Sequence, residues 1–285
     1  MAFDLRIGKF RLSIGATSTT PRVYEGGSTS ARARHWTTQD LSATRAVLND
    51  AATMRARARQ LARNNAWAAS ALKTWVANCV GSGIKPRPRG PDQALRGAIS
   101  ALWSRWVVEA DADGMLDFYG LQALVAREQL EAGELMVRKR LRRASDGLSV
   151  PLQLQLIEAD HLPLNLTRPA ADRNVIRAGI EFDPLGQRVA YHLWRDHPGD
   201  SSLTFRANET VRVPAEFVLH IFEPLRAGQI RGVTGFAPVL VSLIEIDQYN
   251  DAEIVRKKTA AMFSLFIETP NPEMEPFGQG DPPSA

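Results

Sequence analysis

Residues 217–270 decide how the chain is organised. They begin with an apolar strand pattern, Phe217-Val-Leu-His-Ile-Phe222, and continue into a turn rich in Gly and Arg, Glu223-Pro-Leu-Arg-Ala-Gly-Gln-Ile-Arg-Gly232. A helical pattern then runs from Pro238 to Phe263 and is far longer than its neighbours. A helix of this length either spans a core or leaves its domain to contact other chains. The turn, with Arg226, Gly228, Arg231 and Gly232, is predicted to be the elbow that launches it.

Charge is unevenly distributed along this predicted helix. Glu245, Asp247 and Asp251 lie in its first part, and Arg256-Lys-Lys258 lies near its end, where cations complement the helix dipole. Apolar residues leave one side for packing. A solvated helix has similar charges, so the pattern alone permits both interpretations.

Composition is that of an ordinary globular protein. The chain has 285 residues, of which 44% are hydrophobic and 23% charged, with a net charge of +4. The single cysteine, Cys79, excludes an intramolecular disulfide and lies in an apolar helical run, which predicts a buried thiol. We expect no membrane span and no signal peptide, because no sufficiently long apolar stretch is present.

The order of patterns predicts an α+β fold: a helical N-terminal region, a small mixed or antiparallel sheet, and the one long helix. Residues 1–35 are rich in Ser, Thr, Gly and Arg and indicate a flexible basic arm. Asp40 or Ser42, Asn64-Asn65 and Asp117 are predicted helix boundaries. Residues 93–110 form a helix whose buried side is expected to hold Leu95, Ile99, Leu102, Trp103 and Trp106. Residues 135–142 alternate as a strand with one basic face, and Asp183-Pro-Leu-Gly186 predicts a hairpin turn.

Three arginines recur every fourth residue on the first predicted helix. Arg55, Arg59 and Arg63 would therefore share one face. They form a solvated face, or contact a phosphate backbone, or meet the acidic surface of a neighbouring subunit. The sequence does not distinguish these alternatives.

Catalytic and metal-binding motifs are not recognisable. The sequence has no phosphate-binding loop, no nucleophile elbow and no His-Glu-x-x-His pair. Glu158, Asp160 and His161 form the one acid–base grouping, which would suit a hydrolase, but no nucleophile accompanies it. His220 alternates with apolar residues and is expected to be a hydrogen-bonded core or interface histidine. We expect neither an enzyme nor a bound cofactor or metal.

Four ordered groups of segments resemble the lambda-type portal proteins of tailed bacteriophages. They are residues 54–66 with Asn78-Cys-Val-Gly-Ser-Gly-Ile84, then Leu154-Gln-Leu-Ile-Glu-Ala-Asp-His-Leu162, then residues 178–191 with His197-Pro-Gly-Asp200, and finally residues 213–222 with Arg226-Ala-Gly-Gln-Ile-Arg-Gly-Val233. Together they cover most of residues 31–270 in the family's order.

This resemblance implies a structural subunit of a ring, typically a dodecamer, at one capsid vertex. Double-stranded DNA would pass through its channel, and terminase, capsid and head-completion proteins would bind it. The subunit would belong to the virion and occupy the host cytoplasm during assembly. The alternative is a basic DNA-binding protein that forms no ring, with Arg55, Arg59 and Arg63 as its contacts.

The resemblance also implies a domain division. Residues 36–233 are similar to the family's wing, and residues 234–267 to its first stem helix and the start of its clip. Residues 268–285 are rich in Pro and Gly, a composition that indicates a disordered end. Glu245, Asp247 and Asp251 would then face the channel. The family's remaining clip, second stem helix and crown have no counterpart in these residues, so the chain resembles a C-terminally truncated N-terminal portion.

Overall fold

The computed structural model describes residues 3–7, 10–14, 37–200 and 209–262, and its residues cluster into two units, 1–41 and 42–285. The first unit contains an antiparallel hairpin of β1 (Phe3–Ile7) and β2 (Phe10–Ile14). The sequence did not predict this hairpin. Residues 15–36 of the predicted arm and the predicted disordered end lie outside the described residues.

The second unit is an α+β structure, which confirms the predicted fold class. Its helices are α1 (Ala43–Asn64), α2 (Ala66–Cys79), α3 (Gln93–Glu109), α4 (Phe118–Glu131) and α5 (Leu240–Met262). Its strands form two sheets, and both are antiparallel, as the order of patterns allowed. No helix that the structure describes is both long and apolar enough to cross a membrane.

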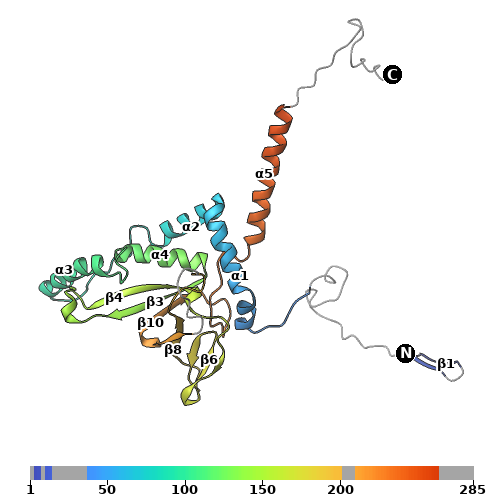
Figure 1. Ribbon diagram of the computed structural model, residues 1–285, viewed down its shortest axis with the longest axis horizontal. Coiled ribbons are helices and arrows are strands. Elements are labelled where there is room, and N and C mark those ends of the chain that lie inside the picture. The colour runs from blue at the N-terminus through green and yellow to red at the C-terminus, as the bar shows by residue number, and fades with distance from the viewer. Residues whose placement is uncertain (1–2, 8–9, 15–36, 201–208, 263–285) are drawn as a thin grey trace, which may run out of the picture. The chain divides into compact units, whose positions relative to one another are not determined.

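The smaller sheet has three strands in the order β10-β3-β4. They are β3 (Glu134–Leu141), β4 (Leu152–Glu158) and β10 (Val218–Phe222). Helices α3 and α4 cover one face of this sheet, where Trp106, Ala110 and Leu121 form a small core against the leucines of β4 (Figure 1).

The larger sheet has five strands in the order β5-β6-β7-β8-β9. They are β5 (Arg168–Pro169), β6 (Val175–Arg177), β7 (Ile180–Phe182), β8 (Arg188–Trp194) and β9 (Thr210–Pro214). The predicted hairpin joins β7 to β8, and the Asp183 carboxylate accepts hydrogen bonds from the N–H groups of Leu185 and Gln187 in its turn. The main core lies between the two sheets and includes Met136, Ile180, Tyr191 and Val213.

The helix boundaries follow from side-chain capping. Ser42 caps α1, Asn65 separates α1 from α2 and caps α2, and Asp117 caps α4, each by accepting a hydrogen bond from a backbone N–H of the first turn. These three predicted boundaries are confirmed.

Two predictions of burial are wrong. Cys79 is exposed, because it lies in the last turn of α2 beyond the part that packs on α1 and α4. On α3 the structure buries Trp106, whereas Leu95 and Ile99 are 57% and 46% exposed. Only the C-terminal part of α3 packs against α4 and β4, so its apolar N-terminal part has no partner within the described residues.

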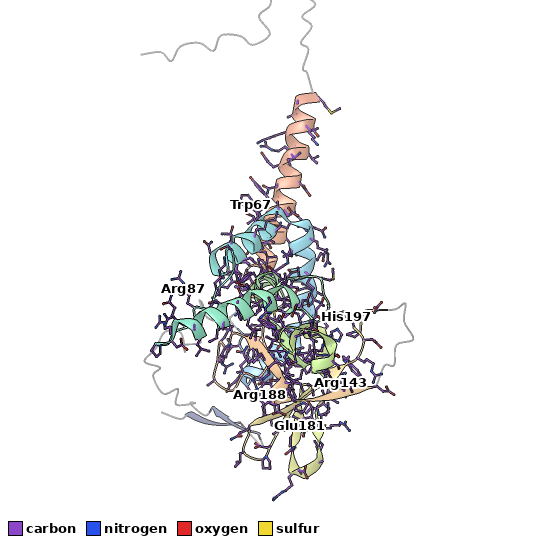
Figure 2. All side chains as sticks on the ribbon, turned by 90° about the vertical axis from the view of Figure 1, so that its left-hand side faces the viewer. Trp67, Arg87, Arg143, Glu181, Arg188 and His197 are labelled. Carbon is purple, nitrogen blue, oxygen red and sulfur yellow. The ribbon has the colours of Figure 1, made fainter. Side chains whose placement is uncertain are left out.

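Helix α5 packs against the described residues of its unit only over its first turn. Phe236 and Leu240 are buried against Ala58, Leu61, Ala62 and Leu72 of α1 and α2. Beyond Leu243 no residue of α5 belongs to a core cluster of the described residues, and its side chains extend outward on all sides above Trp67 (Figure 2). Of the two options that the sequence left open, the first is excluded for the described residues, because the helix does not span a core.

Candidate functional site

The base of α5 is fixed by a buried ion-pair network centred on Glu134, the first residue of β3. Arg231 of the predicted elbow is fully buried, and its Nε donates to both Glu134 carboxylate oxygens at 2.9 Å. Arg231 Nη1 also donates to the Ala178 carbonyl oxygen at 3.0 Å, and the Gly232 N–H donates to Glu134 Oε2 at 2.7 Å. The elbow is therefore attached to both sheets by one side chain.

A second arginine reaches the same carboxylate from α1. Arg55 Nη2 donates to Glu134 Oε1 at 3.0 Å, and Arg55 Nη1 donates to Asp160 Oδ1 at 3.3 Å. Burial alone would raise the pKa of the Glu134 carboxyl, but the Arg231 charge and the hydrogen bonds from His220 and Arg231 hold that pKa well below its usual value. Glu134 is thus a permanently charged anchor that joins β3, α1 and the elbow.

His220 of β10 completes the network. Its Nε2 lies 3.1 Å from Glu134 Oε2, and burial lowers the pKa of the imidazole more than Glu134 raises it. The ring is therefore neutral at neutral pH, and its Nε2 carries the proton because a carboxylate only accepts. The predicted role, a hydrogen-bonded core histidine, is confirmed.

The backbone of the elbow also contacts the end of α4 directly. A Cβ added to Gly232 would lie 2.2 Å from the Gly133 carbonyl oxygen, a separation that only glycine permits. The Thr234 hydroxyl then donates to the Leu130 carbonyl oxygen at 3.1 Å. The predicted elbow residues divide accordingly: Arg231 and Gly232 are buried, whereas Arg226 and Gly228 lie at its exposed outer turn.

The three predicted arginines of α1 do not form one exposed face. Arg55 is 2% exposed, and half-buried Arg59 donates to Asp160 Oδ2 at 2.7 Å and to Glu158 Oε2 at 3.0 Å. Only Arg63 is exposed. Intramolecular carboxylates, which the sequence did not place opposite these residues, thus bind two of the three cations.

The predicted acid–base grouping is an ion-pair site. Glu158 and Asp160 lie near His197, whose Nε2 is 3.5 Å and 4.0 Å from their oxygens, while His161 Nδ1 contacts the Trp194 carbonyl oxygen instead. Arg59 binds both carboxylates, and Arg55 also binds Asp160. The ligand atoms of Glu158, Asp160 and His197 lie within 4.8 Å of one another, a spacing that could hold a metal ion, but arginines bind both carboxylates in this structure.

Glu181 forms a separate polar cluster on β7. Its carboxylate accepts from Arg212 Nε at 2.8 Å, from Asn174 Nδ2 at 2.8 Å, and contacts His192 Nε2 at 2.9 Å. The hydrogen bond from Arg212 is the main cause that lowers the pKa of Glu181 to about 2. The carboxylate is therefore ionised throughout the physiological range.

This cluster predicts a pH-dependent difference in stability. A carboxyl whose folded pKa is lowered stabilises the fold fully above its unfolded pKa, about 4.3, and loses that contribution as pH falls toward the folded value. We expect Glu181→Gln to lower the melting temperature clearly at pH 7 and much less at pH 3. Circular dichroism melting at both pH values measures this, with exposed Glu216→Gln as the control. Equal losses at both pH values would contradict the assignment.

The acidic residues of α5 are exposed but do not share one face. Successive residues of a helix are rotated by about 100°, so Asp247 and Asp251 lie close together while Glu245 is turned roughly a third of a revolution from Asp251. All three are exposed in the structure. Glu253, by contrast, binds Arg256 at 2.9 Å. If one side of α5 faces a channel, it presents Asp247 and Asp251, or Glu245, but not all three.

The sequence of the chain is similar to those of known proteins. A family model described as "Phage portal protein, lambda family" matches residues 29–284. The chain is similar to the probable portal protein of Halomonas phage phiHAP-1, with 28% identity over 244 residues that cover 82% of this chain and 46% of that protein. It is similar also to the portal protein of Escherichia phage N15, with 25% identity over 274 residues, 86% of this chain and 48% of that protein.

Portal protein B of Escherichia phage lambda gives the same result, with 25% identity over 271 residues that cover 86% of this chain and 49% of that protein. The chain spans about half the length of the curated relatives that it matches. Since the family match covers nearly all of its residues, the chain belongs to the lambda family of phage portal proteins.

Proposed function

We propose that the chain is a structural subunit of a portal ring at a phage capsid vertex, through which DNA is packaged and ejected and to which the tail side of the particle attaches. The observation that supports this most is α5: a helix of 23 residues that, among the described residues, is packed only at its base. In proteins most of a helix's stability comes from the packing of its apolar face. A helix that leaves its domain therefore needs partners, and neighbouring copies in a ring would supply them.

The exposed side chains of α5 fit such partners. Val241, Ile244, Val255 and Met262 fall within about 60° of one another around the helix, and all are exposed, from 38% for Ile244 to 84% for Met262. Elsewhere Trp67 of α2 and Leu95 of α3 are also more than half exposed. Apolar surface of this extent is typical of interaction sites.

The proposal includes a division into domains. Residues 36–233 would be the wing and residues 234–267 the stem helix with the start of the clip, joined at the buried network around Glu134. Terminase, capsid and head-completion proteins are the proposed partners, with double-stranded DNA in the channel. The ring is proposed to be a dodecamer that resides in the virion and assembles in the host cytoplasm, without enzymatic activity of its own.

The alternative of a DNA-binding protein that forms no ring loses its main support. It rested on the predicted basic arm, residues 1–35, and on Arg55, Arg59 and Arg63 as a free basic face, and the first two of these arginines are bound to Glu134, Asp160 and Glu158. We therefore favour the portal subunit.

Self-association through α5 is the expected consequence. We expect sedimentation velocity to show concentration-dependent association of the chain, and Ile244→Glu/Val255→Glu to weaken it at least tenfold, because two charges would have to be buried between copies. The matched control is Ser242→Glu/Asn250→Glu, which adds the same two charges at exposed residues of the same helix that are turned about 100° or more away from the apolar stripe. Identical association of all three proteins would contradict the proposal.

A further inference from the structure

Strand β3 begins in the core between the two sheets, and burial decreases toward its end. Met136 of β3 is fully buried in the core with Leu193 and Val213 of the larger sheet. Side chains on one face of a strand recur every second residue, so Arg138 and Arg140 follow Met136 on the same face. Beyond Met136, arginines therefore occupy the space that apolar side chains fill in the core.

Two adjoining hollows, of about 440 Å³ and about 430 Å³, lie beside this part of β3 and form the two halves of one cleft. Arg138, Arg140 and Val213 line both halves. The first half is bounded further by Arg142, Arg212, Pro214 and Phe217, and the second by Gln155, Trp194 and Arg195. The cleft is thus basic along its whole length.

The positive charge of the cleft is largely uncompensated. Among the described residues no carboxylate lies within ion-pair distance of Arg138, Lys139 or Arg140; Arg212 is paired with Glu181, and Asp113 is the one acidic residue in the lining. Burial and the neighbouring Arg140 charge lower the pKa of Arg138. Two neighbouring guanidinium groups form a site for an anion, because each offers a planar fork that fits a carboxylate or phosphate.

Beyond Arg138 the edge of β3 beside the first half of the cleft has no paired strand among the described residues, although the 3₁₀ turn Ala215–Phe217 lies near it. The pairing of β10 with β3 ends at Val218 opposite Arg138, whereas β4 follows β3 as far as Leu141. In the described part of the chain, residues 139–141 thus have a paired strand on one side only. An extended segment can add to such an edge through main-chain hydrogen bonds.

We propose that this cleft binds an extended acidic polypeptide segment of a partner protein, which adds as a strand beside residues 139–141 and places its carboxylates against Arg138 and Arg140. A single strand occupies about 4.8 Å in the plane of a sheet and enters the cleft. A DNA duplex has no peptide N–H and C=O groups that could pair with the edge of β3 at residues 139–141.

The test is binding of fluorescein-labelled hexaglutamate to the full 285-residue chain, followed by fluorescence anisotropy at low salt. We expect Arg138→Gln/Arg140→Gln to raise Kd at least tenfold. The control, Arg45→Gln/Arg57→Gln, removes the same charge from two exposed positions of α1 and is expected to change Kd less than twofold. An equal loss in both variants would show attraction by diffuse charge and overturn the proposal.

Further experiments test how the ligand binds and to which chemical class it belongs. A peptide of twice the length that alternates Glu and Pro carries the same number of glutamates as hexaglutamate but has a main-chain donor at only every second residue, and it is expected to bind at least fivefold more weakly. Hydrogen exchange on the wild-type chain, which does not depend on any variant folding, should show slower exchange at residues 139–141 when hexaglutamate binds. No protection there would overturn the strand addition. Displacement of the peptide by a short DNA duplex whose own binding is lost in Arg138→Gln/Arg140→Gln would make the cleft a nucleic-acid site instead.

Discussion

Replacing Arg231 with Met lowers the free energy of unfolding by about 3–5 kcal/mol, because it leaves the buried Glu134 carboxylate without its main counter-charge. Arg231 and Glu134 are both fully buried, and three nitrogens of the Arg231 guanidinium donate within the core. Arg55 and His220 remain bound to Glu134 but approach it from other sides. Urea unfolding followed by circular dichroism measures the loss.

The control for this prediction is Arg256→Met on α5. Arg256 pairs with Glu253 on the surface, where an ion pair contributes at most about 1 kcal/mol. The double variant Glu134→Leu/Arg231→Met should be less destabilised than the sum of its single changes, because it removes both charges together. A loss below about 1 kcal/mol for Arg231→Met would show that the network does not hold the elbow in place.

Gly232→Ala is expected to destabilise the fold by about 3 kcal/mol, the upper end of the usual effect of overpacking. The added Cβ would lie 2.2 Å from the Gly133 carbonyl oxygen and 2.7 Å from the Glu134 Cβ, so two backbone segments would have to separate. That separation would also lengthen the Gly232 N–H bond to Glu134. Thermal unfolding measures the loss directly.

Gly97→Ala is the matched control for this substitution. Gly97 lies in α3, and an added Cβ there meets nothing within 4 Å, so alanine should be neutral or stabilise the helix by about 0.5–1 kcal/mol. Equal melting temperatures for Gly232→Ala and the wild type would mean that the elbow and β3 are not held in this close approach.

Local features of the fold could be predicted from the sequence because they depend on neighbouring residues. Ser42, Asn65 and Asp117 cap helices through their own first turns, and the turn beginning at Asp183 closes a hairpin of adjacent strands. The alternation of residues 135–142 identified β3 and its basic face. The length of α5 followed from its periodicity, and its bounds agree within the described residues.

The buried network could not be predicted, because its members are distant in sequence. Arg55 and Glu134 are 79 residues apart, and Glu134 and Arg231 are 97 apart. A spacing of four residues shows that Arg55 and Arg59 share a helix face, but not that carboxylates of another element cover that face. A glutamate directly before an apolar strand and directly after Gly133 was the one signal available for Glu134.

The same limitation explains why burial was predicted wrongly for part of α3 and for Cys79. Periodicity shows which side of a helix is apolar but not how far the packing partner extends, so Leu95 and Ile99 were expected in a core that ends near Trp103. In the proposed ring these exposed residues and the apolar stripe of α5 have a common explanation, since neighbouring copies would cover both.

Cryo-electron microscopy of the purified protein tests the ring assignment most directly. We expect closed rings in which the α5 helices of adjacent copies surround the central channel, with the network around Glu134 at the outer base of each helix. Particles that remain monomers at every concentration, or rings with α5 on the outer rim, would contradict it.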